Sequence, residues 1–125
     1  MKKGFDDLSY AVIGAAIEVH RHLGPGLLES TYQQCLAREL RLNDIDFKME
    51  YPLAVEYKGI RLDCGYKIDM FVEDVLILEL KSIDRLKPIH EAQLLSYMKL
   101  AQVNHGFLIN FNVEVLKHGI KSFVL

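Results

Sequence analysis

Two acidic residues and a lysine in the middle of the sequence are the residue types best suited to chemistry. Glu79 and Lys81 follow the apolar run at residues 75–78 and are separated by a single residue. Because side chains alternate along a β-strand, Glu79 and Lys81 should project from the same face. A carboxylate at the end of a buried strand is costly to desolvate unless a metal, hydrogen bonds or a cation compensates its charge.

Asp69 is the second carboxylate. Matching Val72 with Leu76 across a three-residue turn keeps the apolar residues of two successive strands on one face. That register places Asp69 opposite Glu79, with Cβ atoms about 5 Å apart. Two adjacent carboxylates repel each other, and a divalent cation that prefers oxygen ligands, Mg²⁺ or Mn²⁺, would remove the repulsion. The alternative is an ordinary Glu–Lys pair where a strand meets solvent, with Asp69 on a solvated hairpin face.

Further polar residues lie next to predicted apolar stripes. Glu29 lies one helical turn before Tyr32 and therefore borders the buried face of its helix. The alternative for Glu29 is a carboxylate that complements the helix dipole. Gln93 and Tyr97 are four residues apart on a later helix, beside the apolar stripe that contains Leu94. The alternative for these two residues is a solvated helix flank.

Hydrophobic periodicity predicts the elements that must position these side chains. In chain order we expect helices at 8–23 and 28–40, strands at 47–57, 60–72 and 75–81, a helix at 88–101, and strands at 106–110 and 120–124, with a short piece at 113–116. Gly24-Pro25-Gly26 should separate the first two helices, and Lys58-Gly59 should form a tight turn between the first two strands. The order α-α-β-β-β-α-β-β predicts an α/β sandwich with a mixed sheet.

Composition limits the class of protein. The chain has 125 residues, half of them hydrophobic, which suits one domain spanning 1–125. A net charge of -2 argues against a basic coat that binds nucleic acid over the whole surface. No apolar run of about 18 residues is present, so we expect no membrane span. Acidic residues near the start, where a signal peptide needs apolar ones, predict a cytoplasmic protein.

Cysteine and histidine do not suggest a metal site. Cys35 and Cys64 are too few for a zinc site or a disulfide scaffold, and both fall on apolar faces, so we interpret them as buried small side chains. The five histidines are scattered, and we expect them to be surface or capping residues.

The combination of these residues resembles the PD-(D/E)xK nuclease superfamily. More narrowly, the heptapeptide running from Gly26 through Glu29 to Tyr32, followed by YKID at 66–69 and LELK at 78–81, resembles the small bacterial family called GxxExxY proteins. The resemblance covers nearly the whole chain. One position departs from the superfamily motif, because Ile68 stands where the motif has proline.

The resemblance implies a restriction-endonuclease-like core and a role for each candidate. Asp69 and Glu79 would bind Mg²⁺ or Mn²⁺, and Lys81 would be the catalytic lysine. Glu29 would be an accessory metal or water ligand, and Gln93 and Tyr97 would flank the substrate. The implied activity is metal-dependent hydrolysis of phosphodiester bonds in nucleic acid, with DNA favoured over RNA. The alternative is a non-catalytic binding or assembly module that keeps a metal site.

Substrate binding would need more than these residues. A basic path for phosphates could be formed by the cationic side chains nearest the proposed site: Lys67, Lys81, Arg85, Lys87 and Lys99. The alternative is that these are solvated residues interleaved with acids. A chain this short has little surface for selecting a substrate, so we expect a homodimer or a partner protein.

Overall fold

The computed structural model describes residues 5–125, and this part of the chain contains three α-helices, five strands and one 3-10 helix. In chain order they are α1 (Phe5–Leu23), α2 (Glu29–Leu42), β1 (Phe47–Tyr57), β2 (Ile60–Val72), β3 (Leu76–Lys81), α3 (Pro88–Ala101), β4 (His105–Asn110), η1 (Leu116–Gly119) and β5 (Ile120–Val124). The predicted α/β class and element order are confirmed. The short piece expected at 113–116 is different: it consists of bends that lead into η1, because the chain must reverse there to enter an antiparallel strand.

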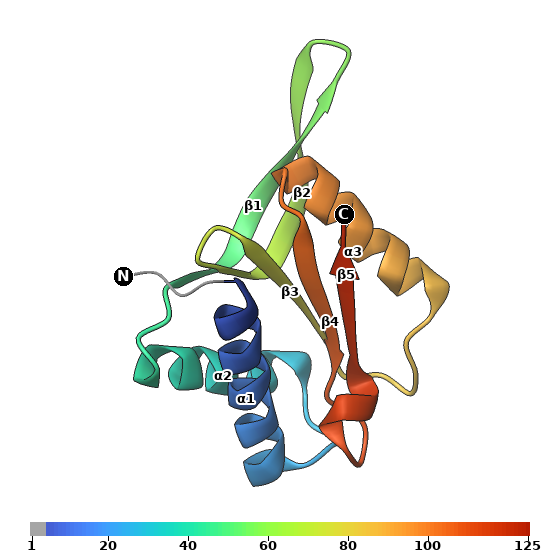
Figure 1. The fold of residues 1–125 in the computed structure, drawn as a ribbon. Helices are drawn as coiled ribbons and strands as arrows, with labels where there is room; N and C mark the ends of the chain where they lie inside the picture. Colours follow the sequence, from blue (N-terminus) through green and yellow to red (C-terminus); the bar gives the residue numbers. More distant parts are fainter. Residues whose placement is uncertain (1–4) are drawn as a thin grey trace.

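The five strands form one mixed sheet in the order β1-β2-β3-β4-β5. Neighbouring strands are antiparallel except β3 and β4, which run parallel and are connected through α3. α1 and α2 pack on one face of the sheet and α3 packs on the other (Figure 1). On β3, Leu78 and Leu80 contact the α1–α2 layer, whereas Ile77 contacts the α3 layer. The prediction of a central strand covered on both faces is therefore confirmed.

The turn between β2 and β3 sets the position of the two candidate carboxylates. Its register is the predicted one, with Met70 paired to Leu78. The ladder between β2 and β3 ends at this pair, so Asp69 and Glu79 are the next residues on their strands. They lie where the two strands begin to separate.

β1 and β2 form a long hairpin, and its outer end protrudes from the body of the molecule (Figure 1). The turn is the predicted Lys58-Gly59, and both residues have positive φ (46° and 87°), as a tight hairpin turn requires. Glycine at φ 79° occurs again within β2, at Gly65, whose main-chain N–H donates to Asp63 Oδ1. This second glycine marks a bulge in the strand.

The bulge changes the pairing of the hairpin by two residues. Val55 pairs with Leu62 on the outer side, whereas Leu53 pairs with Tyr66 on the inner side, so β2 has two extra residues there. We call residues 55–62 the hairpin arm. Three of its apolar side chains are exposed, although the alternating pattern predicts that they face a core: Tyr57 is 58% exposed, Ile60 55% and Leu62 40%.

Three predictions about single residues are corrected. Cys64 is exposed, because no helix covers the part of β2 beyond the bulge, and Cys35 is half-buried. His20 is buried rather than superficial, and its Nε2 donates to the Val113 carbonyl oxygen at 2.7 Å. That hydrogen bond ties α1 to the bends before η1. Among the described residues, no helix combines the length and apolar character needed to cross a bilayer.

Candidate active site

Asp69 and Glu79 replace main-chain pairing where β2 separates from β3. The main-chain N–H of Asp69 donates to Glu79 Oε1 at 3.3 Å, and that of Leu80 donates to Asp69 Oδ2 at 2.8 Å. Each carboxylate therefore accepts a hydrogen bond from the opposite strand. Glu79 is 4% exposed, so its carboxylate is held in an environment that disfavours charge.

The electrostatics of this pair favour a bound cation. Burial, followed by the charge of Asp69, raises the pKa of Glu79 to about 9. Burial also raises the pKa of Asp69, although its hydrogen bond from Leu80 opposes this. With its pKa raised this far, Glu79 holds a proton at neutral pH, because burial and the neighbouring Asp69 charge disfavour its ionised form. A divalent ion could take the place of that proton, and oxygen ligands of this kind suit Mg²⁺ or Mn²⁺.

Lys81 lies close to both acids. Its positive charge lowers the pKa of Asp69 and of Glu79, against the larger effect of burial. The side chain is half-buried at the end of β3, two residues after Glu79. The structure thus brings together the Asp69, Glu79 and Lys81 side chains that we predicted from the sequence.

Glu29 is the first residue of α2 and reaches the same end of β3. Its Oε2 accepts a hydrogen bond at 3.2 Å from the main-chain N–H of Ser82, the residue after Lys81. The Ser82 hydroxyl in turn donates to the Leu27 carbonyl oxygen at 2.5 Å. Glu29 is exposed, and this contact keeps its carboxylate beside the end of β3.

Tyr32 stabilises the loop that carries Glu29. Its hydroxyl donates to the Gly24 carbonyl oxygen at 2.6 Å and accepts from the Leu27 N–H at 3.2 Å. Its ring stacks on Phe111 with centroids 4.4 Å apart. Gly26 has a φ of 95°, which a glycine tolerates best. The spacing of Gly26, Glu29 and Tyr32 is thus explained by a loop that fixes the start of α2.

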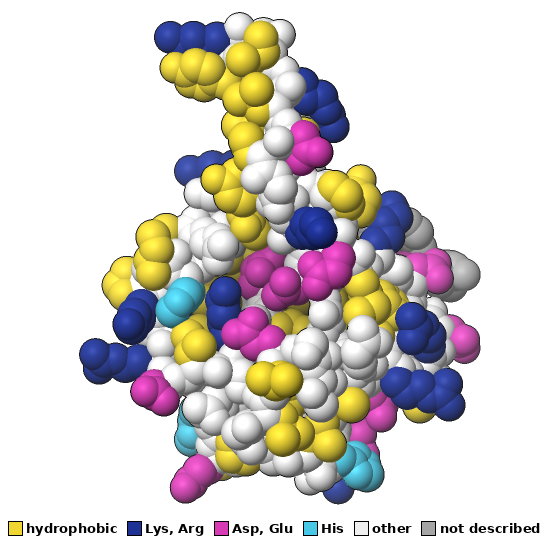
Figure 2. All heavy atoms as spheres, turned by 180° about the vertical axis from the view of Figure 1, so that it is seen from behind, with side chains coloured by type: hydrophobic (Ala, Val, Ile, Leu, Met, Phe, Trp, Pro, Cys, Tyr) yellow, Lys and Arg dark blue, Asp and Glu magenta, His cyan; other side chains and the backbone are white. Residues whose placement is uncertain are grey.

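A cavity of about 470 Å³ lies between the start of α2 and strands β1–β3. Its lining consists of Leu27, Leu28, Glu29, Ser30, Gln33, Glu50, Asp69, Leu80 and Ser82. Figure 2 shows Asp and Glu side chains gathered in a hollow beneath the protruding hairpin, with Lys or Arg side chains beside them. Within residues 5–125, no three His, Cys, Asp or Glu side chains are grouped tightly enough to form a ready metal-ligand set. The adjacent pair of Asp69 and Glu79 is the part that fits a divalent ion.

Two lining residues were missed by the sequence analysis. Gln33 is buried, and its Nε2 donates to the Asp69 carbonyl oxygen at 2.9 Å and to Glu50 Oε1 at 3.3 Å. A polar residue one turn after Glu29, on the buried side of α2, was the available signal for Gln33. Glu50 was hidden by the bulge: the register at the turn, continued unchanged, would have paired Glu50 with Lys67.

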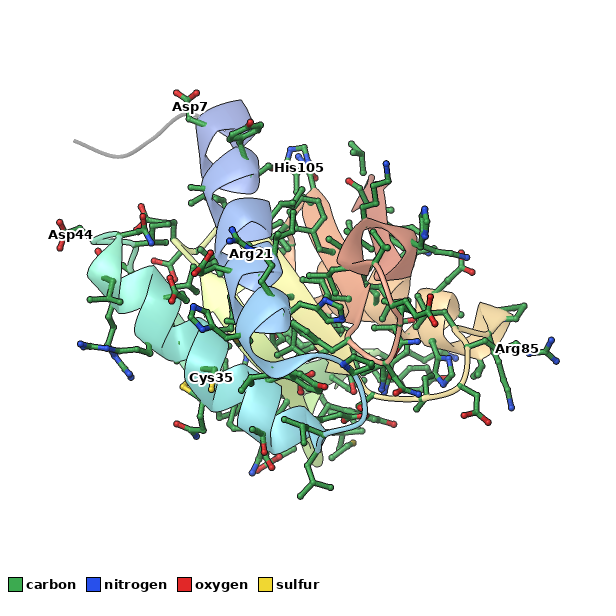
Figure 3. All side chains as sticks on the ribbon, turned by 90° about the horizontal axis from the view of Figure 1, so that it is seen from below. Asp7, Arg21, Cys35, Asp44, Arg85 and His105 are labelled. Atoms are coloured by element: carbon green, nitrogen blue, oxygen red, sulfur yellow. The ribbon has the colours of Figure 1, made fainter. Side chains whose placement is uncertain are left out.

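The predicted substrate-flanking residues lie on the α3 side of the sheet. Gln93 Nε2 donates to the Tyr97 hydroxyl at 3.1 Å. Tyr97 is buried, so it is not part of a solvated helix flank. Its pKa is raised by burial and by the negative charges of Glu79 and Asp69. Among the basic residues considered for a phosphate path, Arg85 projects outward from the loop before α3 (Figure 3).

The fold and the order of these side chains agree with a comparison against known families. A family model described as the PD-(D/E)XK nuclease superfamily matches residues 6–123. The chain belongs to the PD-(D/E)XK nuclease superfamily. The narrower GxxExxY resemblance is not confirmed, and no curated protein or solved structure matches the sequence. PD-(D/E)XK nucleases usually use divalent metals, which agrees with the chemistry of the Asp69–Glu79 pair.

Proposed function

We propose that this protein is a metal-dependent nuclease that hydrolyses phosphodiester bonds in nucleic acid. Asp69 and Glu79 bind Mg²⁺ or Mn²⁺. Lys81 orients the attacking water and stabilises the negative charge on the phosphate. The observation that carries the proposal is the meeting of Asp69, half-buried on β2, with Glu79, buried on β3, and the positive charge of Lys81 acts on both carboxyl groups. Two adjacent carboxylates that are shielded from water lower the stability of the fold, and a bound cation offsets this loss.

Phosphodiester hydrolysis needs an activated water and neutralisation of charge on the phosphate. A divalent ion supplies Lewis acidity, which lowers the pKa of water and polarises a phosphate oxygen. The main-chain N–H of Leu80 holds Asp69 Oδ2 in place, so the carboxylate is already oriented before binding. Lys81 orients the attacking water and stabilises the negative charge that develops on the phosphate.

The remaining predicted residues act at the edges of this centre. Glu29, held by Ser82, can accept a proton from the attacking water or orient it. The Tyr97 hydroxyl oxygen accepts a hydrogen bond from the Gln93 amide, so the Tyr97 hydroxyl proton is not used in this contact. Tyr97 can therefore donate a hydrogen bond to a phosphate oxygen on the α3 side.

A cleavage assay tests the proposal. The purified protein is incubated with single-stranded DNA, double-stranded DNA and RNA, with Mg²⁺, Mn²⁺ or EDTA. We expect metal-dependent cleavage that is lost in Glu79→Ala and Lys81→Ala and kept in Glu56→Ala, an exposed residue of the hairpin arm. Equal cleavage by the wild type and both site variants would identify a contaminant or a different site. Metal binding without cleavage of any substrate would favour the non-catalytic module.

A further inference from the structure

We propose that Arg85, Lys87 and His90 form a subsite for a phosphate group of the nucleic acid, beyond the end of β3. This inference rests on the proposed function, since the phosphate belongs to the same substrate. It assigns a ligand to a second cavity, of about 640 Å³, formed by the loop between β3 and α3 and by the first turn of α3. The lining of this cavity consists of Ile83, Asp84, Arg85, Lys87 and His90.

The lining of this cavity is basic. Arg85 and Lys87 are exposed, and within residues 5–125 neither of them forms an ion pair. Asp84 is the acid of the lining and is not paired with either cation, so one negative charge faces two positive ones. Figure 2 shows Lys, Arg and His side chains gathered next to the acidic hollow. A phosphate group would supply the negative charge that these cations lack.

The start of α3 adds to the positive charge. Main-chain N–H groups at a helix N-terminus attract anions, and acidic side chains are favourable there. In α3 the residue before the helix is Lys87, and the acid of the first turn, Glu91, is paired with Lys121 at 3.0 Å. Basic side chains therefore lie at the positive end of the helix dipole, an arrangement that a bound anion stabilises.

His90 offers a hydrogen-bond donor to the same cavity. Its Nδ1 accepts the main-chain N–H of Lys87 at 2.9 Å. The neutral imidazole therefore carries its proton on Nε2, which has no hydrogen-bond partner in the part of the chain that the structure describes. An arginine fork, an ammonium group and an imidazole N–H are donors that suit the oxygens of a phosphate.

Polar contacts hold the loop beside the end of β3. Asn110, buried at the end of β4, accepts the Ile83 N–H at 3.1 Å and donates to the Ile83 carbonyl oxygen at 3.0 Å. The Asn112 amide donates to the same carbonyl oxygen at 3.2 Å. The start of the loop is thus fixed relative to Lys81 before a substrate binds. Such preorganisation lowers the conformational entropy lost on binding.

The distance along the chain suits neighbouring phosphates of one nucleic-acid strand. Arg85 lies four residues after Lys81, so their Cα atoms are at most about 14 Å apart. Successive nucleotides of a B-form strand rise about 3.4 Å, so the subsite lies within about four nucleotides of the reacting phosphate. Lys99, also considered for a phosphate path, lines a different cavity beside the hairpin arm. We therefore place the phosphate contacts at Arg85 and Lys87.

The test measures binding of 3′-fluorescein-labelled oligonucleotides to the full-length protein by fluorescence anisotropy, in EDTA and at several salt concentrations. Arg85→Gln and Lys87→Gln should each weaken binding about tenfold and lower the slope of log Kd against log salt by about 1, equally for different base sequences. Arg85→Lys keeps the charge and should keep the slope. Arg38→Gln, which changes an exposed arginine on α2, is the matched control and should leave both quantities unchanged.

The cleavage assay gives a second measurement on the same variants. With Mn²⁺, Arg85→Gln and Lys87→Gln should raise KM about tenfold and change kcat little, because the subsite binds substrate away from the reacting bond. A loss seen only with 5′-phosphorylated oligonucleotides would place a terminal phosphate in the subsite. An equal loss without that group would place an internal phosphate there. Circular dichroism establishes that each variant folds.

The outcomes separate this inference from the proposed function. If Arg85→Gln and Lys87→Gln match the wild type in Kd, salt slope and KM, the cavity is not a phosphate subsite. The same conclusion follows if Arg38→Gln loses as much affinity as they do. In both cases metal-dependent cleavage by the wild type would still support the proposed function. If the wild type neither binds nor cleaves any oligonucleotide, the proposed function and this inference both fail.

Discussion

The two halves of the β1–β2 hairpin have similar sequence patterns and different surroundings. Apolar residues alternate with polar ones in both halves, yet Ile68 and Met70 on the inner half are fully buried while Leu62 in the hairpin arm is 40% exposed. The difference comes from the helices, which cover the sheet and end before the arm (Figure 1). Alternation therefore indicates a strand, whereas burial depends on a second layer being present.

The same contrast separates two aspartates on one strand. Asp63 is exposed and accepts a hydrogen bond from Gly65, two residues later. Asp69 is partly buried, accepts from Leu80 on the next strand, and lies against Glu79. A carboxylate becomes a candidate ligand when tertiary structure places it beside another carboxylate and away from water.

The largest expected effect tests this contrast directly. Asp69→Asn should reduce metal-dependent cleavage at least about 100-fold, because the ion loses a ligand while the fold is kept. Asp63→Asn is the matched control, since its amide oxygen can still accept from Gly65, and it should cleave like the wild type. Initial rates at saturating Mn²⁺ measure both. Equal losses in the two variants would show that the halves of β2 do not differ in function.

Core substitutions should show the same contrast in stability. Ile68→Ala removes a fully buried side chain and should lower the free energy of unfolding by about 2–5 kcal/mol. Leu62→Ala, in the hairpin arm, should change it by less than about 1 kcal/mol. Urea unfolding followed by circular dichroism measures both values. A loss at Leu62 as large as that at Ile68 would mean that the arm is covered in solution, as in a dimer.

The raised pKa of Glu79 predicts how stability depends on pH. Without metal, the folded protein holds a proton on Glu79 up to a pKa of about 9, whereas the unfolded chain releases it near 4.5. The folded state therefore binds more protons in this window, and the free energy of unfolding should fall as the pH rises through it. In EDTA, the urea concentration at the unfolding midpoint should fall less steeply with rising pH for Glu79→Gln than for the wild type. Glu56→Gln, in the hairpin arm, should keep the wild-type slope.

The smallest effect concerns the boundary between the two halves. Gly65→Ala forces a side chain into a φ of 79° and should destabilise the protein by about 1–2 kcal/mol. Gly14→Ala, inside α1, meets no atom within 4 Å of the new Cβ and should stabilise it by about 0.5–1 kcal/mol. Thermal unfolding measures both changes. If Gly65→Ala were neutral, the bulge would not depend on glycine.

Much of the fold could be predicted because it depends on local periodicity. The apolar parity of β2 and β3 predicted the Met70–Leu78 pair, and with it the meeting of Asp69 and Glu79. Glu50 could not be found in this way, because the bulge at Gly65 changes its cross-strand neighbour. His20 was missed for a related reason: its burial depends on Val113, which is distant in the sequence.

The sequence by itself determined the elements, their order and the Glu79-x-Lys81 spacing, because helix and strand periods are properties of neighbouring residues. Only the tertiary structure decided how deeply these carboxylates are buried and which distant residues contact them, since that depends on the bulge at Gly65 and on which face each strand presents. Burial of Glu79, the contact of Gln33 with Asp69 and Glu50, and the exposure of the hairpin arm all follow from the packing of layers. Local pattern specifies the strands, and long-range packing gives their polar residues a shared electrostatic environment.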